Sequence, residues 1–487
     1  MGETNEQPPP PPVAAPPPMM AMMGPPVGAG AIHPPHEQFH HLNYCVHSNP
    51  SWVQVAALAF LHYLVMLGST VMFVSVIVPA MGGNAGDKAR VIQSFLFMSG
   101  INTLLQTLIG TRLPTVMNAS FAFVVPVLSI AREIESNNDL LNSHERFKRT
   151  MRTAQGALIV ASILNMILGF STIWAAYAKK FSPVIMTPVV CVVGLGLFQL
   201  GFPQENRAAH EEKKEKEKEK EPYNVGKCVE IGLPMLILAV IVQQSTGAHF
   251  ATARLAGATP PPAHVLSRSV GLQGIGMFLE GIFSCPAGSS VSVENIGLLG
   301  LTKVGSRRVI QISTGFMIFF SLFGKFGAFF ASIPLPIFAA IYCILFGIVA
   351  AVGVSFMQFA NKNSMRNIYI IGLSLFLGIS IPQYFNEYTS SANGRGPART
   401  NAGWFNDIIN TVFASGPTVA LIVASVLDNT LEFRGYESDR GLSWFQPFLR
   451  RHKGYSDPRN EEFYSFPIRL SLKLDISLQR LMRPSKA

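Results

Sequence analysis

Charged residues are scarce in this sequence. Asp, Glu, Lys and Arg make up 14% of the 487 residues, and hydrophobic residues make up 49%. In soluble domains roughly a quarter of the residues are charged. The charges here also lie between long apolar runs instead of along one face of each segment, as happens when whole helices lie in hydrocarbon. This composition excludes a single soluble core and predicts an all-α protein with many membrane spans.

Cysteine is also rare, and the spacing of the cysteines matches no known metal-binding or redox motif. No two cysteines form a C-x-x-C pair or a zinc-binding pattern, and most lie in apolar runs; the five are Cys45, Cys191, Cys228, Cys285 and Cys343. This excludes a disulfide framework and a zinc site. The sequence has no P-loop, metal cluster or nucleophile triad either, so it does not indicate an enzyme, and no cofactor is expected.

Positive charge exceeds negative charge, with a formal net charge of +10. Such an excess can indicate binding to nucleic acid. Here, however, most Lys and Arg lie in short loops and in the tail, and the preference of basic residues for cytosolic loops explains this more simply. We therefore expect a lipid bilayer around the protein and no nucleic-acid partner.

Two end regions lie outside the predicted spans. Residues 1-43 combine proline blocks with Ala, Gly and Met, so they cannot bury a core, and we expect a disordered cytosolic arm with polyproline II character. A PxxP ligand is the alternative to a simple spacer. Residues 431-487 form an Arg-rich tail, which we also expect in the cytosol.

Residues 44-430 contain about twelve predicted spans. Most basic loop residues fall on the cytosolic side when the N-terminus is inside, although the loop 132-152 and the run 205-227 would face outward. The predicted spans are 53-80, 91-111, 114-131, 153-175, 182-203, 228-253, 270-287, 288-302, 308-331, 334-356, 367-383 and 405-428.

Two of these spans are broken. Residues 113-130 read "LPTVMNASFAFVVPVLSI", and residues 284-302 read "SCPAGSSVSVENIGLLGLT", where proline, glycine and serines precede a carboxylate. Unpaired backbone groups cost several kcal/mol in hydrocarbon, so such stretches persist only when they are buried in protein or line a wet cavity. One interrupted segment in each half of a chain is typical of a transporter with a substrate site at the membrane midplane.

Three of the ionisable residues within the predicted spans are candidates for a functional role. Glu294 follows the second break, and an intramembrane carboxylate is a functional candidate by default; the alternative is a structural carboxylate held by backbone amides. Glu280, in "GMFLEGIF", ranks lower because nothing around it is broken. His62 lies in the middle of a span. A histidine in this position more often forms an interhelical hydrogen bond than contacts a ligand.

The run "ENIGLLGLTK" resembles the motif of the nucleobase-ascorbate transporter family. That motif reads Gln, Glu or Pro, then Asn-x-Gly, four residues, and Thr before Arg, Lys or Gly. Stretches such as "LIGTRLPTVMNASFAF" and "ATPPPAHVLSR" look like the plant branch of the family, and the resemblance extends from about Tyr44 to Phe466. The motif positions are Glu294, Asn295, Gly297, Thr302 and Lys303.

The resemblance implies a fold and a function. The fold is a seven-plus-seven inverted repeat with a core and a gate domain, often dimeric through the gate. Members move purines, pyrimidines, urate or ascorbate by symport with protons or sodium. We therefore expect a small planar solute as the substrate and the plasma membrane as the location.

The resemblance also assigns roles to single residues. Ser120 and Phe121 would line the site, with Phe121 stacking on the ring of the solute. Glu294 would hydrogen-bond the substrate with support from Asn295. The remaining motif positions would support the site, through close helix approach at Gly297 and tuning of the cytosolic end at Thr302 and Lys303.

The sequence departs from the family pattern at three positions. The first span has Leu61 before His62, where members usually have Gln-His, and Asn118 stands where a small residue is usual. In addition, the eighth span of plant members has a binding glutamate in Glu-Ser-Thr-Gly, but this chain has Gln244 at the start of that tetrad. One acid of the expected site has become an amide.

The stretch before Gln244 indicates an internal deletion. "KCVEIGLPMLILAVIV" resembles the start of the sixth span and "STGAHFATARLAGATPPP" the end of the eighth, so two spans are effectively missing. One hybrid helix over 228-253 can replace both, since the sixth and eighth spans cross in the same direction. The run 204-227, with alternating Glu and Lys, is predicted to be an inserted solvated loop.

Two hypotheses follow. The first is a secondary transporter that uses Glu294, Ser120 and Phe121, with Gln244 and His62 near the solute. The second is a protein of the same fold that no longer transports and acts, if at all, through heteromers with full-length relatives. Because of the missing spans and Gln244, the second hypothesis has more weight than the family resemblance alone would give it.

Overall fold

The computed structural model describes part of the chain. The described residues are 42–136, 143–171, 174, 182–195, 244–323, 335–391, 396–400, 403–431, 440–441 and 463–464. The predicted charged loop 204-227 lies outside them, as do nearly all of the predicted arm, residues 228-243 of the predicted hybrid helix and most of the tail.

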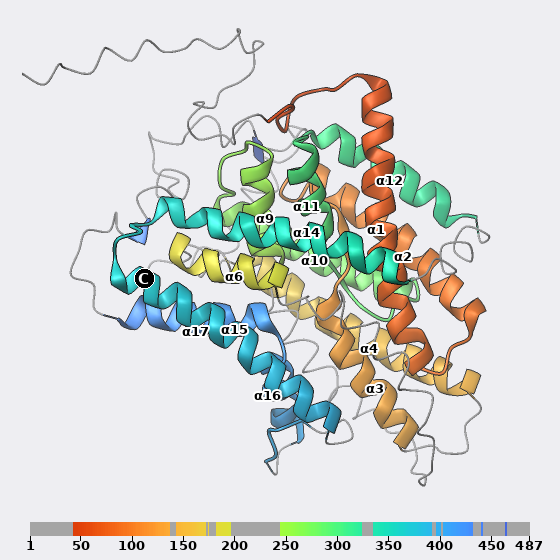
Figure 1. The fold of residues 1–487 in the computed structure, drawn as a ribbon. Helices are drawn as coiled ribbons and strands as arrows, with labels where there is room; N and C mark the ends of the chain where they lie inside the picture. Colours follow the sequence, from red (N-terminus) through yellow and green to blue (C-terminus); the bar gives the residue numbers. More distant parts are fainter. Residues whose placement is uncertain are drawn as a thin grey trace, which may run out of the picture.

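Helices dominate the described residues (Figure 1), as the sequence predicts. Two three-residue strands interrupt them, β1 (Met117–Ala119) and β2 (Ser289–Val291), and two 3-10 turns, η2 (Phe121–Phe123) and η5 (Phe356–Phe359). The helices are α1 (Trp52–Ala80), α2 (Ala85–Leu108), α3 (Val124–Ser136), α4 (Ser143–Phe170), α6 (Pro183–Leu195), α9 (Gln244–Leu255), α10 (Ala263–Ile282), α11 (Val293–Thr302), α12 (Arg307–Ser321), α14 (Leu335–Ser355), α15 (Met365–Ser391), α16 (Gly403–Phe413) and α17 (Gly416–Thr430).

Several helices are long and apolar enough to cross a bilayer. A helix rises about 1.5 Å per residue, so about 20 apolar residues span the hydrocarbon core. Among the described residues four helices meet this condition: Trp52–Ala80, Ala85–Leu108, Ser143–Phe170 and Met365–Thr389. The broken segments and the shorter helices α9 and α11 are packed among them.

The helices pack in two groups. In Figure 1, α6, α15 and α17 lie at the left and α1, α2 and α12 at the right, while α14 runs across the middle. In the first group, α10 packs along α4, and α12 packs against α1 and α2. Small residues allow the closest of these contacts, since a Cβ atom at Gly169 of α4 would lie 2.0 Å from the backbone nitrogen of Gly271 in α10. In the second group, α6 packs against α14, α15 and α17. Helices α9 and α11 contact α14 of the second group.

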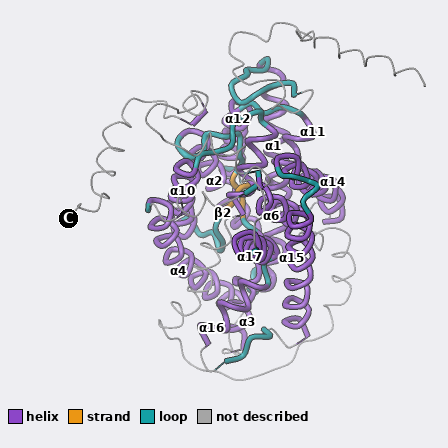
Figure 2. The backbone as a smooth tube through the Cα atoms, turned by 90° about the vertical axis from the view of Figure 1, so that its left-hand side faces the viewer, coloured by secondary structure: helices purple, strands orange, loops and turns teal. Residues whose placement is uncertain are grey.

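The two broken segments meet in the middle of the molecule, where Figure 2 shows the strands in orange. β1 and β2 pair antiparallel, with Asn118 opposite Ser290. The pairing continues at both ends, because the N–H of Ser120 donates to the carbonyl of Gly288 at 3.0 Å and the N–H of Ser292 donates to the carbonyl of Val116 at 2.8 Å. The non-helical backbone of each broken segment is thus hydrogen-bonded to the backbone of the other. Backbone groups in a low-dielectric interior need such partners.

One predicted span and one predicted loop differ from the structure. The segment 405-428 is two helices, α16 and α17, which break at Ala414 and Ser415 just before Gly416 and Pro417. Proline fits the first turn of a helix but has no N–H for the turn before it, so a new helix starts there. The loop expected over 132-152 is largely helical, since α3 continues to Ser136 and α4 begins at Ser143.

A buried carboxylate joins the second group at one end. Asp428 of α17 has a fully buried side chain that accepts hydrogen bonds from Arg366 of α15 at 3.0 Å and from Arg440 at 2.6 Å. The hydroxyl of Ser182, which precedes α6, donates to the same carboxylate at 2.8 Å. One side chain therefore ties together α15, α17, the start of α6 and the segment that follows α17.

Replacing Asp428 with Asn should destabilise this group. The change leaves two guanidinium groups beside a neutral amide, and removing one member of a buried ion pair costs about 3 kcal/mol. We expect the Tm of the purified variant in detergent to fall by several degrees. The matched control is Glu387→Gln, which neutralises an exposed acid near the end of α15 and should leave the Tm unchanged. An unaltered Tm for Asp428→Asn would show that the network contributes nothing.

Candidate substrate-binding site

Each strand of the central pair leads directly into a short helix. β1 is followed by Ser120 and η2, and β2 is followed by Ser292 and α11. The pair therefore brings the residues predicted from the two halves of the chain, Ser120 and Phe121 on one side and Glu294 and Asn295 on the other, into one region. The N-terminus of α11, with the positive end of its dipole, lies in the same region.

Glu294 is held by the cap of its own helix. Its side chain is buried, with 4% of the residue exposed, and the hydroxyl of Ser292 donates to Oε2 at 2.6 Å. The Ser292 oxygen in turn accepts from the side-chain amide of Asn295 at 2.9 Å. The predicted binding acid is therefore oriented by a local network, in which Asn295 has the supporting position that the sequence assigned to it.

His62 lies close to this network. On α1 it is buried, and its Nδ1 shares a hydrogen bond with Oδ1 of Asn295 at 2.9 Å. This contact joins α1 to α11, which is the interhelical role considered for His62 from the sequence. In this arrangement His62 reaches the candidate site through Asn295.

Asn118, the amide at a position where a small residue is usual, fastens β1 to α1. Its Nδ2 donates to the carbonyl of Met66 at 3.1 Å and to the hydroxyl of Ser69 at 2.5 Å. Its Oδ1 accepts from the hydroxyl of Thr70 at 2.8 Å. Buried hydrogen bonds of this kind stabilise by about 1 kcal/mol each, and leaving a partner unpaired costs more. The unusual residue thus has a clear structural use.

Phe121 lies where the apolar cores of the two helix groups meet. It is part-buried and packs against both cores. The ring of Phe73, on α1, stands edge-on to it, with the ring centroids 5.8 Å apart and the planes at 71°. An edge-to-face contact of this kind fixes the orientation of a ring while leaving its other surfaces available for stacking.

Gln244 is the first described residue of α9, and the described part of the predicted hybrid helix is helical from this residue to Leu255. The residue after it, Ser245, accepts a hydrogen bond from the N–H of Val291 in β2 at 3.4 Å. The Gln-Ser-Thr-Gly tetrad therefore lies beside the strand pair.

The remaining motif positions lie on α11. Gly297 is buried in the helix, and the hydroxyl of Thr302 donates to the carbonyl of Leu298 at 2.9 Å. Lys303 ends the helix in the left-handed conformation, with φ of 57°, and its carbonyl accepts from the N–H of Asn43 at 3.0 Å. Thr302 and Lys303 thus close the far end of the helix that carries Glu294.

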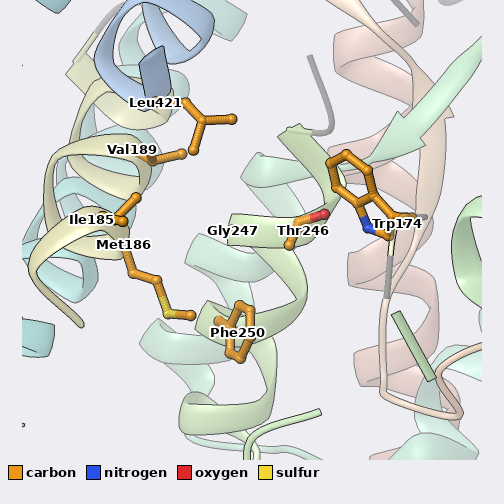
Figure 3. A pocket seen from close by; sticks show the side chains of 8 residues that line it. All are labelled: Trp174, Ile185, Met186, Val189, Thr246, Gly247, Phe250 and Leu421. Carbon is orange, nitrogen blue, oxygen red and sulfur yellow. The ribbon is translucent and has the colours of Figure 1, made fainter. Parts of the chain in front are cut away.

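A pocket lies beside the tetrad, with α6 and α17 on one side and α9 and Trp174 on the other (Figure 3). Residues of α6 face residues of α9 across it, and its walls are mostly apolar. It is lined by Trp174, Ile185, Met186, Val189, Thr246, Gly247, Phe250 and Leu421.

Sequence reasoning missed two parts of this region. Trp174 and Phe250 gave no signal of their own, because aromatic residues in apolar segments usually belong to the core. Glu280 was noticed but ranked low, although the structure places its carboxylate against Ser289, the first residue of β2. The break that it supports lies nine residues further along the chain, so the local sequence around Glu280 could not reveal it.

Comparisons with known proteins bear on the whole chain. A model described as Permease family matches residues 53–244 and 227–387. Nucleobase-ascorbate transporter 3 of Arabidopsis thaliana is 50% identical, over 91% of this chain and 93% of that protein, and nucleobase-ascorbate transporter 2 is 47% identical, over 90% and 97%. Among solved structures, the transmembrane domain of a cyanobacterium bicarbonate transporter, BicA, matches with a TM-score of 0.35 at 13% identity, covering 69% of this chain and 98% of that one.

The lengths of these alignments are informative. The alignment with nucleobase-ascorbate transporter 3 runs over 537 residues, whereas this chain has 487, so at least 50 aligned positions have no counterpart here. The two matches to the family model overlap over residues 227–244, which is where the sequence indicated the seam.

These relatives decide the class of protein. They are named transporters, so the prediction that the chain is not an enzyme is confirmed, as is the prediction of a helical transporter fold. The family match covers most of the chain and the identities are high. The chain therefore belongs to the permease family of the nucleobase-ascorbate transporters and is an integral multi-pass membrane protein.

Proposed function

We propose that this protein moves a nucleobase, urate or ascorbate across the membrane by ion-coupled symport. The observation that supports this most is the pairing of β1 with β2, which holds Ser120, Phe121 and Glu294 in one region next to an aromatic-lined pocket. The relatives named above are nucleobase-ascorbate transporters. We place the protein in the plasma membrane, with a proton or sodium as the coupling ion.

The chemistry of the region suits a planar polar solute. Such a solute presents ring N–H donors along its edge and an apolar face above and below the ring. Glu294 can accept from the edge, and the rings of Phe121, Trp174 and Phe250 can contact the faces. Few polar groups within a mostly apolar wall are usual for small-molecule sites, because these groups fix the orientation of the ligand.

The position of the pocket suits alternating access. Its walls come from α6 and α17 of the second helix group and from α9, which contacts β2 and α11. The first group would act as the moving core and the second as the gate. A solute held between α9 and the second group would pass from one side to the other if α9 and the strand pair shift with the first group.

A specific observation favours a second candidate function. At least 50 aligned positions of a relative are missing here, and Gln244 replaces the acid that the family resemblance places at the site. A chain without these elements can retain the fold and yet fail to bind or release a solute. In that case it acts through heteromers with full-length relatives, or has no transport activity.

Uptake by cells discriminates between these functions. Transporter-deficient cells that express the protein at the surface should accumulate labelled xanthine, uric acid, uracil or ascorbate with saturable kinetics. Glu294→Gln should reduce this uptake at least 10-fold, since a hydrogen bond to a charged group is worth about 1.5–3 kcal/mol. The matched control is Glu145→Gln, at an exposed acid in the first turn of α4, and it should have no effect.

Two results would contradict the proposal in different ways. No uptake of any of the four solutes, with surface expression confirmed, would favour the non-transporting form. Saturable uptake that Glu294→Gln leaves unchanged would place the binding site elsewhere.

Restoring the missing acid is an independent test. Gln244→Glu should raise the affinity for the transported solute, with KM falling several-fold, because the family resemblance places a binding carboxylate at this position and a carboxylate is a stronger acceptor than an amide. The same change at Gln383, on α15, is the control and should not alter KM. If Gln244→Glu has no effect or abolishes uptake at normal surface expression, the tetrad no longer contributes to the site.

A further inference from the structure

Glu280 is a second buried carboxylate at the strand pair, and it is not among the pocket-lining residues. It lies on α10 and has no exposed surface. Its Oε1 accepts from Nδ2 of Asn102, on α2, at 2.8 Å, and its Oε2 accepts from the N–H of Ser289 at 2.8 Å. Among the described residues, no Lys, Arg or His forms an ion pair with it. A carboxylate in this position carries a charge that only hydrogen bonds compensate.

Ser289 connects this carboxylate to the strand pair through hydrogen bonds. All three of its polar groups are bound by side chains of α2 and α10. Its N–H donates to Glu280, its hydroxyl oxygen accepts from Nδ2 of Asn102 at 3.0 Å, and its carbonyl accepts from Nε2 of Gln273 at 2.8 Å. Because Ser289 is the first residue of β2, a change in these bonds shifts the strand that leads to Glu294.

One polar atom in this cluster has no hydrogen-bond partner among the described residues. Oδ1 of Asn102 is buried, and no described residue donates a hydrogen bond to it. An unsatisfied buried acceptor costs about 1–3 kcal/mol, so its presence needs a reason. Rotating the amide by half a turn would bring Oδ1 to the place now occupied by Nδ2, between Glu280 and Ser289.

The rotated amide fits a protonated Glu280. With a proton on Oε1, the Glu280 O–H would donate to Oδ1 of Asn102, and the hydroxyl of Ser289 would donate to the second lone pair of the same oxygen. Oε2 would continue to accept from the N–H of Ser289. The present arrangement satisfies the carboxylate and the rotated one satisfies the acid, and they differ by one proton and one amide rotation. In each arrangement one polar atom of the Asn102 amide, Oδ1 in the first and Nδ2 in the second, occupies the place without a partner.

The surroundings contain few other charges. The titratable group in electrostatic contact with Glu280 is the thiol of Cys285, which follows α10. α2 contributes Asn102, β2 contributes Ser289, and α4 contributes Gln155, whose Nε2 donates to the carbonyl of Gly281 at 2.9 Å. Arg152, one turn earlier on α4, is exposed. The uptake or release of a proton in this cluster therefore changes the charge of one group, Glu280.

We propose that Glu280 is the proton-binding site of the transport cycle and that Asn102 reorients between its two forms. The proposal rests on the proposed function, since a coupling site requires a transported solute. Proton binding forms an O–H bond at Oε1, and release returns the proton to solvent on the other side of the membrane. Solute binding at Glu294 and proton binding at Glu280 are then linked through β2.

Glu280→Gln tests this directly, because glutamine resembles the protonated acid and cannot release a proton. Its Nε2 can donate to the rotated Asn102 while its oxygen accepts from Ser289. In cells or proteoliposomes, an imposed inward proton gradient should drive net solute uptake by the wild type but at least 10-fold less by the variant. Exchange of internal for external solute should continue, because it needs no proton release. Glu145→Gln should behave as the wild type in both assays.

The outcomes separate this proposal from the proposed function. If the wild type moves no solute, the proposed function fails and the inference falls with it. If the wild type is active and Glu280→Gln still accumulates solute in response to a proton gradient, or loses exchange and net uptake equally, only the inference fails. Uptake driven by a sodium gradient and indifferent to the proton gradient would also overturn it.

A second variant guards against a folding defect in the first. Asn102→Ser keeps a small polar group but removes the amide that changes partners. If Glu280→Gln does not reach the surface, Asn102→Ser decides: a shifted pH dependence of uptake with preserved exchange supports the proposal, and a wild-type pH profile overturns it.

Discussion

The antiparallel pairing of β1 with β2 is the interaction on which the rest of the structure depends. Each strand belongs to a different half of the chain, and each would expose unpaired backbone groups within the membrane if it stood alone. Pairing satisfies these groups and at the same time fixes the residues that follow each strand. The requirement for backbone hydrogen bonds therefore creates the candidate site.

Polar side chains hold this pair in place from several helices. Asn118 fastens β1 to α1, whereas Glu280 and Asn102 hold β2 to α10 and α2. His62 and Asn295 connect α1 to the helix that follows β2. Each of these groups is buried and forms hydrogen bonds to other buried groups. Such a network has few alternative arrangements, so a change at one member is passed to the strands rather than absorbed locally.

Much of the fold follows from the sequence. Long apolar runs with few charges predict membrane helices, and proline, glycine and serine near Glu294 predict the break in a span. The sequence does not predict the details that depend on contacts between segments far apart in the chain. Nothing in "VMNASF" alone indicates a strand, because the three residues of β1 become one only through their partner. The division of residues 405-428 into two helices was missed for a different reason, since hydropathy does not register the effect of Gly416 and Pro417.

The candidate site was predicted in part. The strand pair places the segments that carry Ser120 and Phe121 beside the segment that carries Glu294 and Asn295, and their roles in binding stay a prediction. The hydrogen bonds of Glu280 could not be predicted from the sequence, because its partners Asn102 and Ser289 lie elsewhere in the chain.

The central claim is that the strand pair presents Glu294 and Phe121 to a planar solute. Equilibrium binding of labelled xanthine, uric acid, uracil and ascorbate to the purified protein tests it without the need for a complete transport cycle. The account predicts saturable binding of at least one of these solutes, weakened at least 10-fold in Glu294→Gln and in Phe121→Ala. Absence of saturable binding to a protein that shows a cooperative thermal transition, or binding that neither substitution alters, would contradict it.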